Sequence, residues 1–250
     1  MTLLKISDED GIRNLSFNRP NALNAFTPAL LKEFVVAMGE ADKADDIHAV
    51  ILSGEGRAFS AGVDLKVLQG LKLDAGKVGD VFDGAAYEAT NVIRAASIPV
   101  IAKVHGFCFT GALEIALHCD FIYTTETTKF GDTHSKWGLR PTWGMSQNLA
   151  RAVGVRRARE LSFTARTFSG VDAVRWGLAL EAAKNDDELT TLVNEKARAI
   201  AAASPGAISA YKKLYRLHEE NRPLEQALEE EVRLDFPEIN DTAERLSEFM

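Results

Sequence analysis

The chain has 250 residues, of which 46% are hydrophobic and 26% charged, and its formal net charge is −7. These values are typical of a folded globular protein with a sizeable core and exclude a largely disordered chain. The negative charge argues against nucleic acid or an anionic membrane surface as a partner, and no apolar run reaches the roughly 18 residues of a membrane span. We therefore expect no nucleic-acid partner and no membrane association.

The two cysteines, Cys108 and Cys119, belong to no CxxC or Cys/His cluster. This usage is typical of reduced, buried thiols in a cytosolic protein. The first ten residues are too polar for a signal peptide, so we expect a cytoplasmic location, with a processed organelle form left open.

The first half of the chain alternates between predicted strands and helices. A hairpin is predicted at residues 3–17, where two extended segments surround Asp8-Glu9-Asp10-Gly11. Thr27-Pro28 begins an amphipathic helix, because a capping residue precedes a proline and apolar residues then recur at helical spacing. Further elements are expected as a strand at 49–53, a loop at 54–64, a mobile segment at 65–80, a helix at 81–96, a strand at 99–104, a helix at 110–117 and a strand at 121–124. This alternation predicts an α/β fold with a mostly parallel sheet.

After residue 145 the pattern is helical. Helices are predicted at 145–153, 155–163, 170–176, 188–203, 205–219 and 224–236, and the last ~60 residues hold no convincing strand. Because a helical C-terminal region often packs on a neighbouring subunit, we expect an oligomer.

Glu114 is the residue most suggestive of chemistry. It lies in a short helix whose other residues, 111–117, are almost all apolar, and such a helix is usually buried. Loss of hydration raises the pKa of a carboxyl group towards neutrality, which is the range that a general acid or base needs. The alternatives are a glutamate facing solvent or one in a structural ion pair.

Gly111 lies one turn before Glu114, where this helix should begin. A free backbone N–H at a helix N-terminus favours an anion, and glycine lets a ligand oxygen approach closely. An amide of the loop Ala61-Gly62-Val63 would complete a two-donor hole for a thioester oxyanion. A simple helix cap and an ordinary connection between strand and helix are the alternatives.

Several segments resemble the crotonase (enoyl-CoA hydratase/isomerase) family. They are Asn18-Arg19-Pro20 with residues 21–25, Phe59–Leu65, Val104-His105-Gly106 through Glu114 to Asp120, Phe130-Gly131 with Gly138-Leu139, Pro141 and Gly144, Arg151–Gly154, and Trp176-Gly177-Leu178. Each is weak alone, but together they cover roughly residues 3 to 185 in order.

The resemblance implies a crotonase-like spiral of ββα units that binds an acyl-CoA thioester, with no permanently bound cofactor. It implies a core at residues 1–190 and a helical trimerisation region at 191–250, in a homotrimer or a dimer of trimers. Val63 and Gly111 fall at the family's oxyanion-hole amides, and Glu114 falls at one of two catalytic glutamates. The implied coenzyme A and substrate contacts are Ala22, Leu23, Ser60, Ala61, Asp64 and, with less support, Lys66.

The chain departs from the family at the second catalytic glutamate. It reads Phe130-Gly131-Asp132-Thr133-His134, which places His134 at that position. Imidazole exchanges protons near neutral pH, so His134 is interpreted either as the second acid/base, oriented by Asp132, or as a polar loop residue. Thr110 and Ala112 also stand where the family often has glycine.

Other candidates are weaker. Trp137 and Trp143 either line the acyl pocket or pack in the core, and structural roles are expected for Asp64, Asp120 and His105. No cluster has metal-ligand spacing, so no metal is expected. Hydration of a 2-trans-enoyl-CoA is the predicted reaction. Double-bond isomerisation, C–C or thioester hydrolysis, and a catalytically silent CoA-ester binding protein remain the alternatives.

Overall fold

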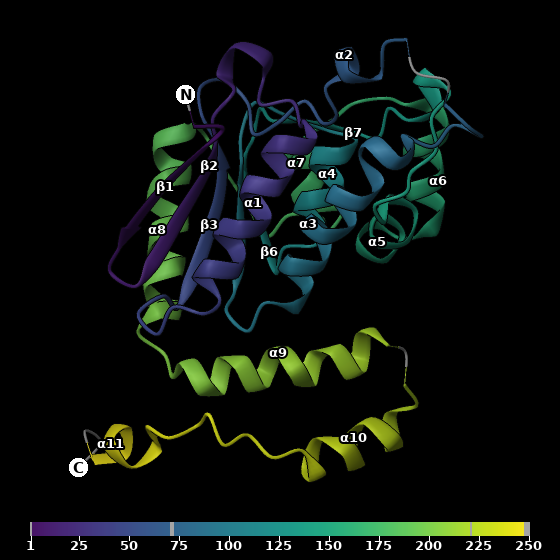
Figure 1. The fold of residues 1–250 in the computed structure, drawn as a ribbon. Helices are drawn as coiled ribbons and strands as arrows, with labels where there is room; N and C mark the ends of the chain where they lie inside the picture. Colours follow the sequence, from purple (N-terminus) through teal and green to yellow (C-terminus); the bar gives the residue numbers. More distant parts are fainter. Residues whose placement is uncertain (1, 71–72, 221, 248–250) are drawn as a thin grey trace.

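The computed structural model describes residues 2–70, 73–220 and 222–247, and its centre is a six-stranded sheet (Figure 1). The strands lie in the order β1 (Leu4–Glu9), β2 (Ile12–Phe17), β3 (Ala49–Gly54), β4 (Val100–Val104), β6 (Phe121–Thr125) and β9 (Glu181–Ala183). β1 and β2 form an antiparallel hairpin, and all other neighbours are parallel. The predicted hairpin and parallel sheet are confirmed.

A second sheet has three strands, β5 (Phe107–Phe109), β7 (Lys129–Gly131) and β8 (Phe168–Ser169). The sequence did not predict these strands or β9, because two or three residues are too few to show an alternating pattern. β5 follows β4 after Gly106, where φ is +64° and an added Cβ would lie 2.0 Å from the Arg57 carbonyl oxygen. Only glycine fits this turn, which brings the loop after β3 against β5.

Helices cover both faces of the large sheet. α1 (Pro28–Ala41) and α3 (Asp83–Ala95) pack on one face in the main core. α8 (Asp186–Ala201) packs on the other face, where Leu189, Val193 and Ala197 contact the strands. α8 extends across residue 190, where the sequence places the end of the core, and the division into a core and an oligomerisation region stays a prediction.

Shorter helices surround the main core. They are α2 (Leu65–Leu68), α4 (Gly111–Ala116), α5 (Met145–Val153), α6 (Val155–Thr164) and α7 (Gly170–Arg175), with 3-10 turns η1 (Pro20–Ala22), η2 (Gly79–Val81) and η3 (Ser135–Trp137). The segment 65–80 contains α2 and the start of η2, while residues 71 and 72 lie outside the described residues, so its predicted mobility remains a prediction.

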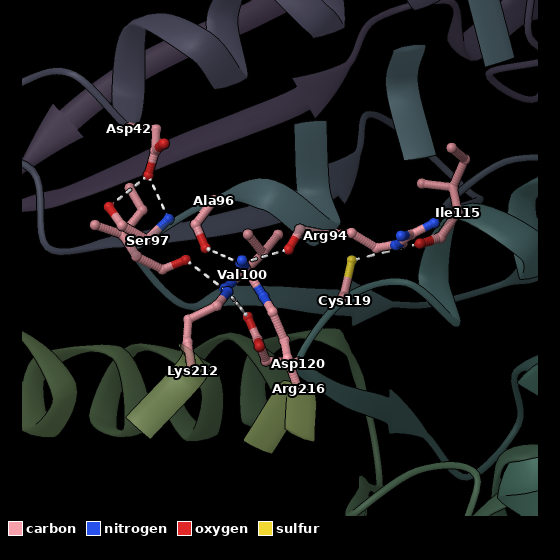
Figure 2. A network of polar contacts seen from close by, with 11 residues as sticks. Asp42, Arg94, Ala96, Ser97, Val100, Ile115, Cys119, Asp120, Lys212 and Arg216 are labelled. Atoms are coloured by element: carbon pink, nitrogen blue, oxygen red, sulfur yellow. Dashed lines mark hydrogen bonds and ion pairs between the residues drawn. The ribbon is translucent and has the colours of Figure 1, made fainter. Parts of the chain in front are cut away.

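The C-terminal helices α9 (Pro205–Glu219), α10 (Leu224–Arg233) and α11 (Thr242–Ser247) lie along one side of the molecule, beyond the end of the sheet (Figure 1). α9 is attached to the core by two cationic side chains (Figure 2). Lys212 Nζ donates to Asp120 Oδ2 at 2.7 Å and to the Ile98 carbonyl, and Arg216 donates to the carbonyls of Arg94 and Ala96. Asp120 therefore has the structural role expected of it.

Candidate active site

Glu114 is buried on α4, as the apolar pattern predicts. Every residue of this helix is buried, and 2% of the Glu114 side chain is exposed. Its Oε1 accepts hydrogen bonds from the N–H groups of Trp143 and Met145, both at 3.1 Å. Met145 is the first residue of α5, so the carboxylate lies at a helix N-terminus, where backbone donors and the helix dipole favour negative charge.

The imidazole of His134 contacts the other oxygen of this carboxylate. His134 Nε2 lies 3.6 Å from Glu114 Oε2, and His134 Nδ1 lies 2.6 Å from Asp132 Oδ1. A carboxylate only accepts, so Nδ1 carries a proton and Nε2 faces Glu114. All three side chains are buried, which gives a carboxylate–imidazole–carboxylate row.

Burial and charge set the protonation of this row. Burial raises the pKa of Glu114 to about 6, although the His134 charge and the two N–H donors oppose the increase. Burial lowers the pKa of His134, but the hydrogen bond with Asp132 and the charge of Glu114 outweigh it, and the net change is upward. For Asp132 burial raises the pKa, but the hydrogen bonds from His134 and Ser162 and the His134 charge together outweigh burial, so the net change is downward. Above pH 6 a carboxylate at Glu114 thus faces an imidazole whose charged form that carboxylate favours.

Gly111 begins α4, so its N–H has no acceptor within the helix. Gly62 lies beside it, because a Cβ at Gly62 would be 3.3 Å from Gly111 N and 2.5 Å from the Phe109 carbonyl oxygen. Val63 follows Gly62 and forms a bridge with Phe26 through the Gly62 carbonyl and the Asp64 N–H. This bridge does not use the Val63 N–H. Because Gly62 lies beside Gly111, the predicted donors, the N–H groups of Val63 and Gly111, come from adjacent backbone segments.

The two predicted tryptophans differ in their surroundings. Trp143 is buried, and its ring packs so closely on Gly111 that an added Cβ would lie 2.5 Å from Cζ3. Its indole N–H finds no hydrogen-bond partner in the described part of the chain. Trp137 lies on η3 with 53% of its surface exposed, next to Lys136, so its place in the acyl pocket remains a prediction.

The loop after β3 and the turn near η1 come together, as the predicted coenzyme A contacts require. The Ala61 N–H donates to the carbonyl of Leu23, which follows Ala22. Ser60 is fully buried, and its hydroxyl donates to the Asn24 carbonyl and accepts from the Gly62 N–H. This hydroxyl therefore supports the loop, which leaves Ala61 as the partly exposed residue of the pair.

Asp64 and Lys66 lie at the start of α2. One oxygen of Asp64 caps this helix through the Lys66 N–H, and the other pairs with Arg19 at 2.9 Å, which confirms the structural role expected of Asp64. The substrate contact of Asp64 stays a prediction, and Lys66 is exposed.

The other titratable candidates lie outside the row. The Nε2–H of His105 donates to the Gly56 carbonyl at 2.8 Å, because a carbonyl oxygen only accepts. Both cysteines are free. Residues 2–70, 73–220 and 222–247 contain no group of three or more His, Cys, Asp or Glu side chains placed to hold a metal ion. None of the described helices is long and apolar enough to span a membrane.

The sequence did not predict the N–H donors of Trp143 and Met145. They lie about thirty residues from Glu114 in the chain, and backbone donors leave no mark in a sequence pattern. Gly144, which has a φ of +106° between them, is the local signal of the turn that aims both groups at one oxygen.

Thr110 has an unfavourable backbone conformation directly before Gly111, with φ 46° and ψ −113°. Such a conformation costs a non-glycine residue about 1–3 kcal/mol. We expect Thr110→Gly to raise the free energy of unfolding by about 1 kcal/mol after the backbone entropy of glycine is subtracted. Thermal unfolding should show a Tm about 2–4 °C higher. A lower Tm would mean that contacts of the threonine side chain outweigh the strain.

Comparisons with known proteins agree with this geometry. The model of the enoyl-CoA hydratase/isomerase family matches residues 7–248. A probable enoyl-CoA hydratase of Rhizobium meliloti is 33% identical over 232 residues, which are 93% of this chain and 86% of that protein. The short-chain-enoyl-CoA hydratase of Clostridium acetobutylicum is 31% identical, with 83% of this chain and 78% of that protein covered.

Solved structures show the same fold. An enoyl-CoA hydratase from Mycobacterium tuberculosis has a TM-score of 0.76 and 33% identity over 93% of this chain and 97% of that chain. An enoyl-CoA hydratase from Bacillus anthracis has a TM-score of 0.86 and 27% identity over 93% of this chain and 89% of that chain. The chain therefore belongs to the enoyl-CoA hydratase/isomerase family and has the crotonase fold.

Proposed function

We propose that this protein hydrates a 2-trans-enoyl-CoA thioester. The observation that supports this most is the buried Glu114 carboxylate facing His134 Nε2 at 3.6 Å, one turn after the Gly111 N–H. Hydration needs a group that accepts a proton from water and another that gives a proton to carbon. It also needs donors for the thioester oxygen, and all three lie together here.

The proposed reaction has two steps. Glu114 takes a proton from water while the water oxygen bonds to the β-carbon, and the electron pair of the double bond moves to the thioester oxygen. The N–H groups of Val63 and Gly111 stabilise this enolate. The α-carbon then takes a proton from the His134 imidazolium. Proton transfer from Glu114 to His134 restores both groups, and one water has been added.

Coenzyme A is placed in this proposal by the loop after β3. Ala61, with Ala22 and Leu23 beside it, offers small side chains and backbone groups to the adenine and pantetheine. Asp64 and the exposed Lys66 lie at the end of the same loop, where the lysine can meet a phosphate. The thioester is a substrate, and the proposal includes no resident cofactor.

Double-bond isomerisation is the second candidate. A relative in Arabidopsis thaliana named as a peroxisomal delta(3,5)-delta(2,4)-dienoyl-CoA isomerase is 30% identical, with 85% of this chain and 80% of that protein covered. Two facing titratable groups can also move a proton between carbons of one acyl chain. Hydrolysis would need the same groups to direct water at a carbonyl, and a silent CoA-ester binding protein would use none of them.

The direct test follows crotonyl-CoA by loss of its enoyl absorbance. Turnover to the hydroxyacyl product supports hydration. If only a dienoyl- or 3-enoyl-CoA is turned over, the reaction is isomerisation and not hydration. Release of free thiol would indicate hydrolysis. Binding of CoA esters without any turnover would overturn the proposal that the protein is an enzyme.

A homotrimer, or a dimer of trimers, is also part of this proposal. Leu224, Leu228 and Val232 recur every four residues on α10 and are 53–87% exposed, which makes an apolar stripe. Analytical ultracentrifugation should give a multiple of three chains, and a monomer would overturn this part. The proposed cytoplasmic location, which composition suggests, is tested by cell fractionation.

His134→Ala should lower kcat by ~10² or more while leaving affinity for the CoA ester nearly unchanged, because it removes the second proton carrier. Steady-state kinetics with crotonyl-CoA measures both constants. Asp132→Asn keeps the ring but removes the charge that favours imidazolium, so a smaller loss is expected. A change confined to KM would make His134 a binding residue only.

The pH dependence of kcat/KM should be bell-shaped. Glu114 must be ionised to accept a proton, so activity falls as pH decreases through its pKa of about 6. His134 must be protonated to donate, so activity falls again as pH rises through its raised pKa. In His134→Ala this decrease at high pH, the alkaline limb of the profile, should disappear. If the decrease persists, it reports on another group.

A further inference from the structure

His118 lies one turn beyond Glu114 and contacts the backbone that holds this glutamate. Its Nε2 lies 2.8 Å from the carbonyl oxygen of Trp143. A carbonyl only accepts, so Nε2 carries the proton and donates. Since the N–H of Trp143 donates to Glu114, both backbone polar groups of Trp143 are bonded to residues of one segment.

The packing around this bond is tight. The Trp143 ring lies against Gly111, so Trp143 meets the segment 111–118 at three successive turns. At the next residue, an added Cβ on Gly144 would lie 3.0 Å from both His118 Nε2 and Asn148 Nδ2. The backbone at 143–145 therefore has little freedom while His118 stays in place.

We infer that His118 is a positioning residue, whose hydrogen bond to the Trp143 carbonyl keeps the N–H groups of Trp143 and Met145 aimed at the Glu114 carboxylate. This inference rests on the proposed function, in which that carboxylate accepts the proton from water. Without the bond, the turn at 143–145 loses one of its anchors, and the N–H donors that stabilise the ionised carboxylate are held less firmly. Glu114 would then hold its proton more tightly.

The charged groups around both residues are few. His118 faces Arg94 of α3 and Glu219 of α9, with Asn148 of α5 beside it, and Glu114 faces His134 and Asp132. Burial lowers the pKa of His118, and the Arg94 charge adds to this. The neutral form of His118 is thus favoured, and Nε2 holds a proton in both charge states of the ring. The acid limb of the rate profile therefore reports on Glu114.

The test compares two replacements of His118 by the pH dependence of kcat/KM with crotonyl-CoA. His118→Met keeps much of the volume and removes the donor, while His118→Gln places an amide N–H₂ near the position of Nε2. We expect His118→Met to move the acid limb upward by about 0.5–1 pH unit and to lower kcat about tenfold with little change in KM. His118→Gln should return the limb towards its original pH.

His105→Met is the matched control, because His105, like the half-buried His118, bonds a backbone carbonyl at 2.8 Å, and it does so without contacting Glu114. It should lower the Tm and leave the acid limb where it was. An unmoved acid limb in folded His118→Met, or the same shift in His105→Met, would overturn the inference. If His118→Met does not fold, His118→Asn supplies the comparison, because its shorter amide does not reach the carbonyl.

Failure of the inference is separable from failure of the proposed function. Turnover that depends on Glu114 but ignores His118 overturns only the positioning role. If crotonyl-CoA is not turned over at all, NMR titration of isotope-labelled glutamate side chains still decides the inference. The Glu114 resonance must then titrate at a higher pH in His118→Met than in the parent protein.

Discussion

Glu114→Gln should lower kcat for crotonyl-CoA by about 10²–10⁴-fold, the largest effect of any single replacement in this chain. Glutamine has nearly the same shape, and its amide oxygen can still accept from the Trp143 and Met145 N–H groups. It cannot take a proton from water. The measurement is the loss of enoyl absorbance, with binding of the CoA ester followed separately, and binding should be almost unchanged.

Stability is the control for this variant. Because the pKa of Glu114 is raised in the folded protein, its ionisation disfavours the fold, and the stability that the protonated form gives is lost as pH rises from 4.5 to about 6. A shift of this size corresponds to about 2 kcal/mol. Glu114→Gln should therefore unfold at the same or a higher temperature than the parent protein at pH 8. Full activity in this variant would contradict the mechanism whichever reaction is observed.

Gly111→Ala should lower kcat by about 10²–10³-fold, the loss typical of removing one oxyanion-hole donor. The added Cβ would lie 2.5 Å from Cζ3 of Trp143, so either the ring or the start of α4 must move. Both backbone groups of Trp143 are held by hydrogen bonds, and we therefore expect α4 to move and to carry the Gly111 N–H with it.

Gly84→Ala is the matched control for this replacement. Gly84 lies in the first turn of α3, is exposed, and has no atom within 4 Å of an added Cβ. Alanine there should leave kcat unchanged and stabilise the protein by about 0.5–1 kcal/mol. If Gly111→Ala and Gly84→Ala have equal activity, the Gly111 N–H does not contact the thioester oxygen.

Regular elements were predictable where the pattern was long enough. The helix from Pro28 and the strand from Ala49 were expected within a few residues, because a capping residue and a run of apolar side chains are local signals. Strands β5, β7 and β8 were missed since each exists only through its neighbours. The packing of α8 on the sheet was not predicted either, because burial of α8 against the sheet is not visible in its own sequence.

The candidate catalytic residues were recognisable in the sequence. Three features of the sequence indicated them. They are a glutamate among apolar residues, a glycine one turn before it, and a histidine in place of a second glutamate. Burial of Glu114 also followed, because a helix apolar on every side has to be covered.

Only the tertiary structure decided how these groups act on one another. The 3.6 Å approach of His134 to Glu114, and the Trp143 turn held between His118 and the carboxylate, join segments about twenty to thirty residues apart. Distances of this kind depend on packing and on backbone donors, which every residue except proline carries, so they leave no trace in residue type. The sequence by itself determined the family and the candidate proton carriers, whereas the pKa values and orientation of these side chains come from burial and hydrogen bonds that exist only in the fold.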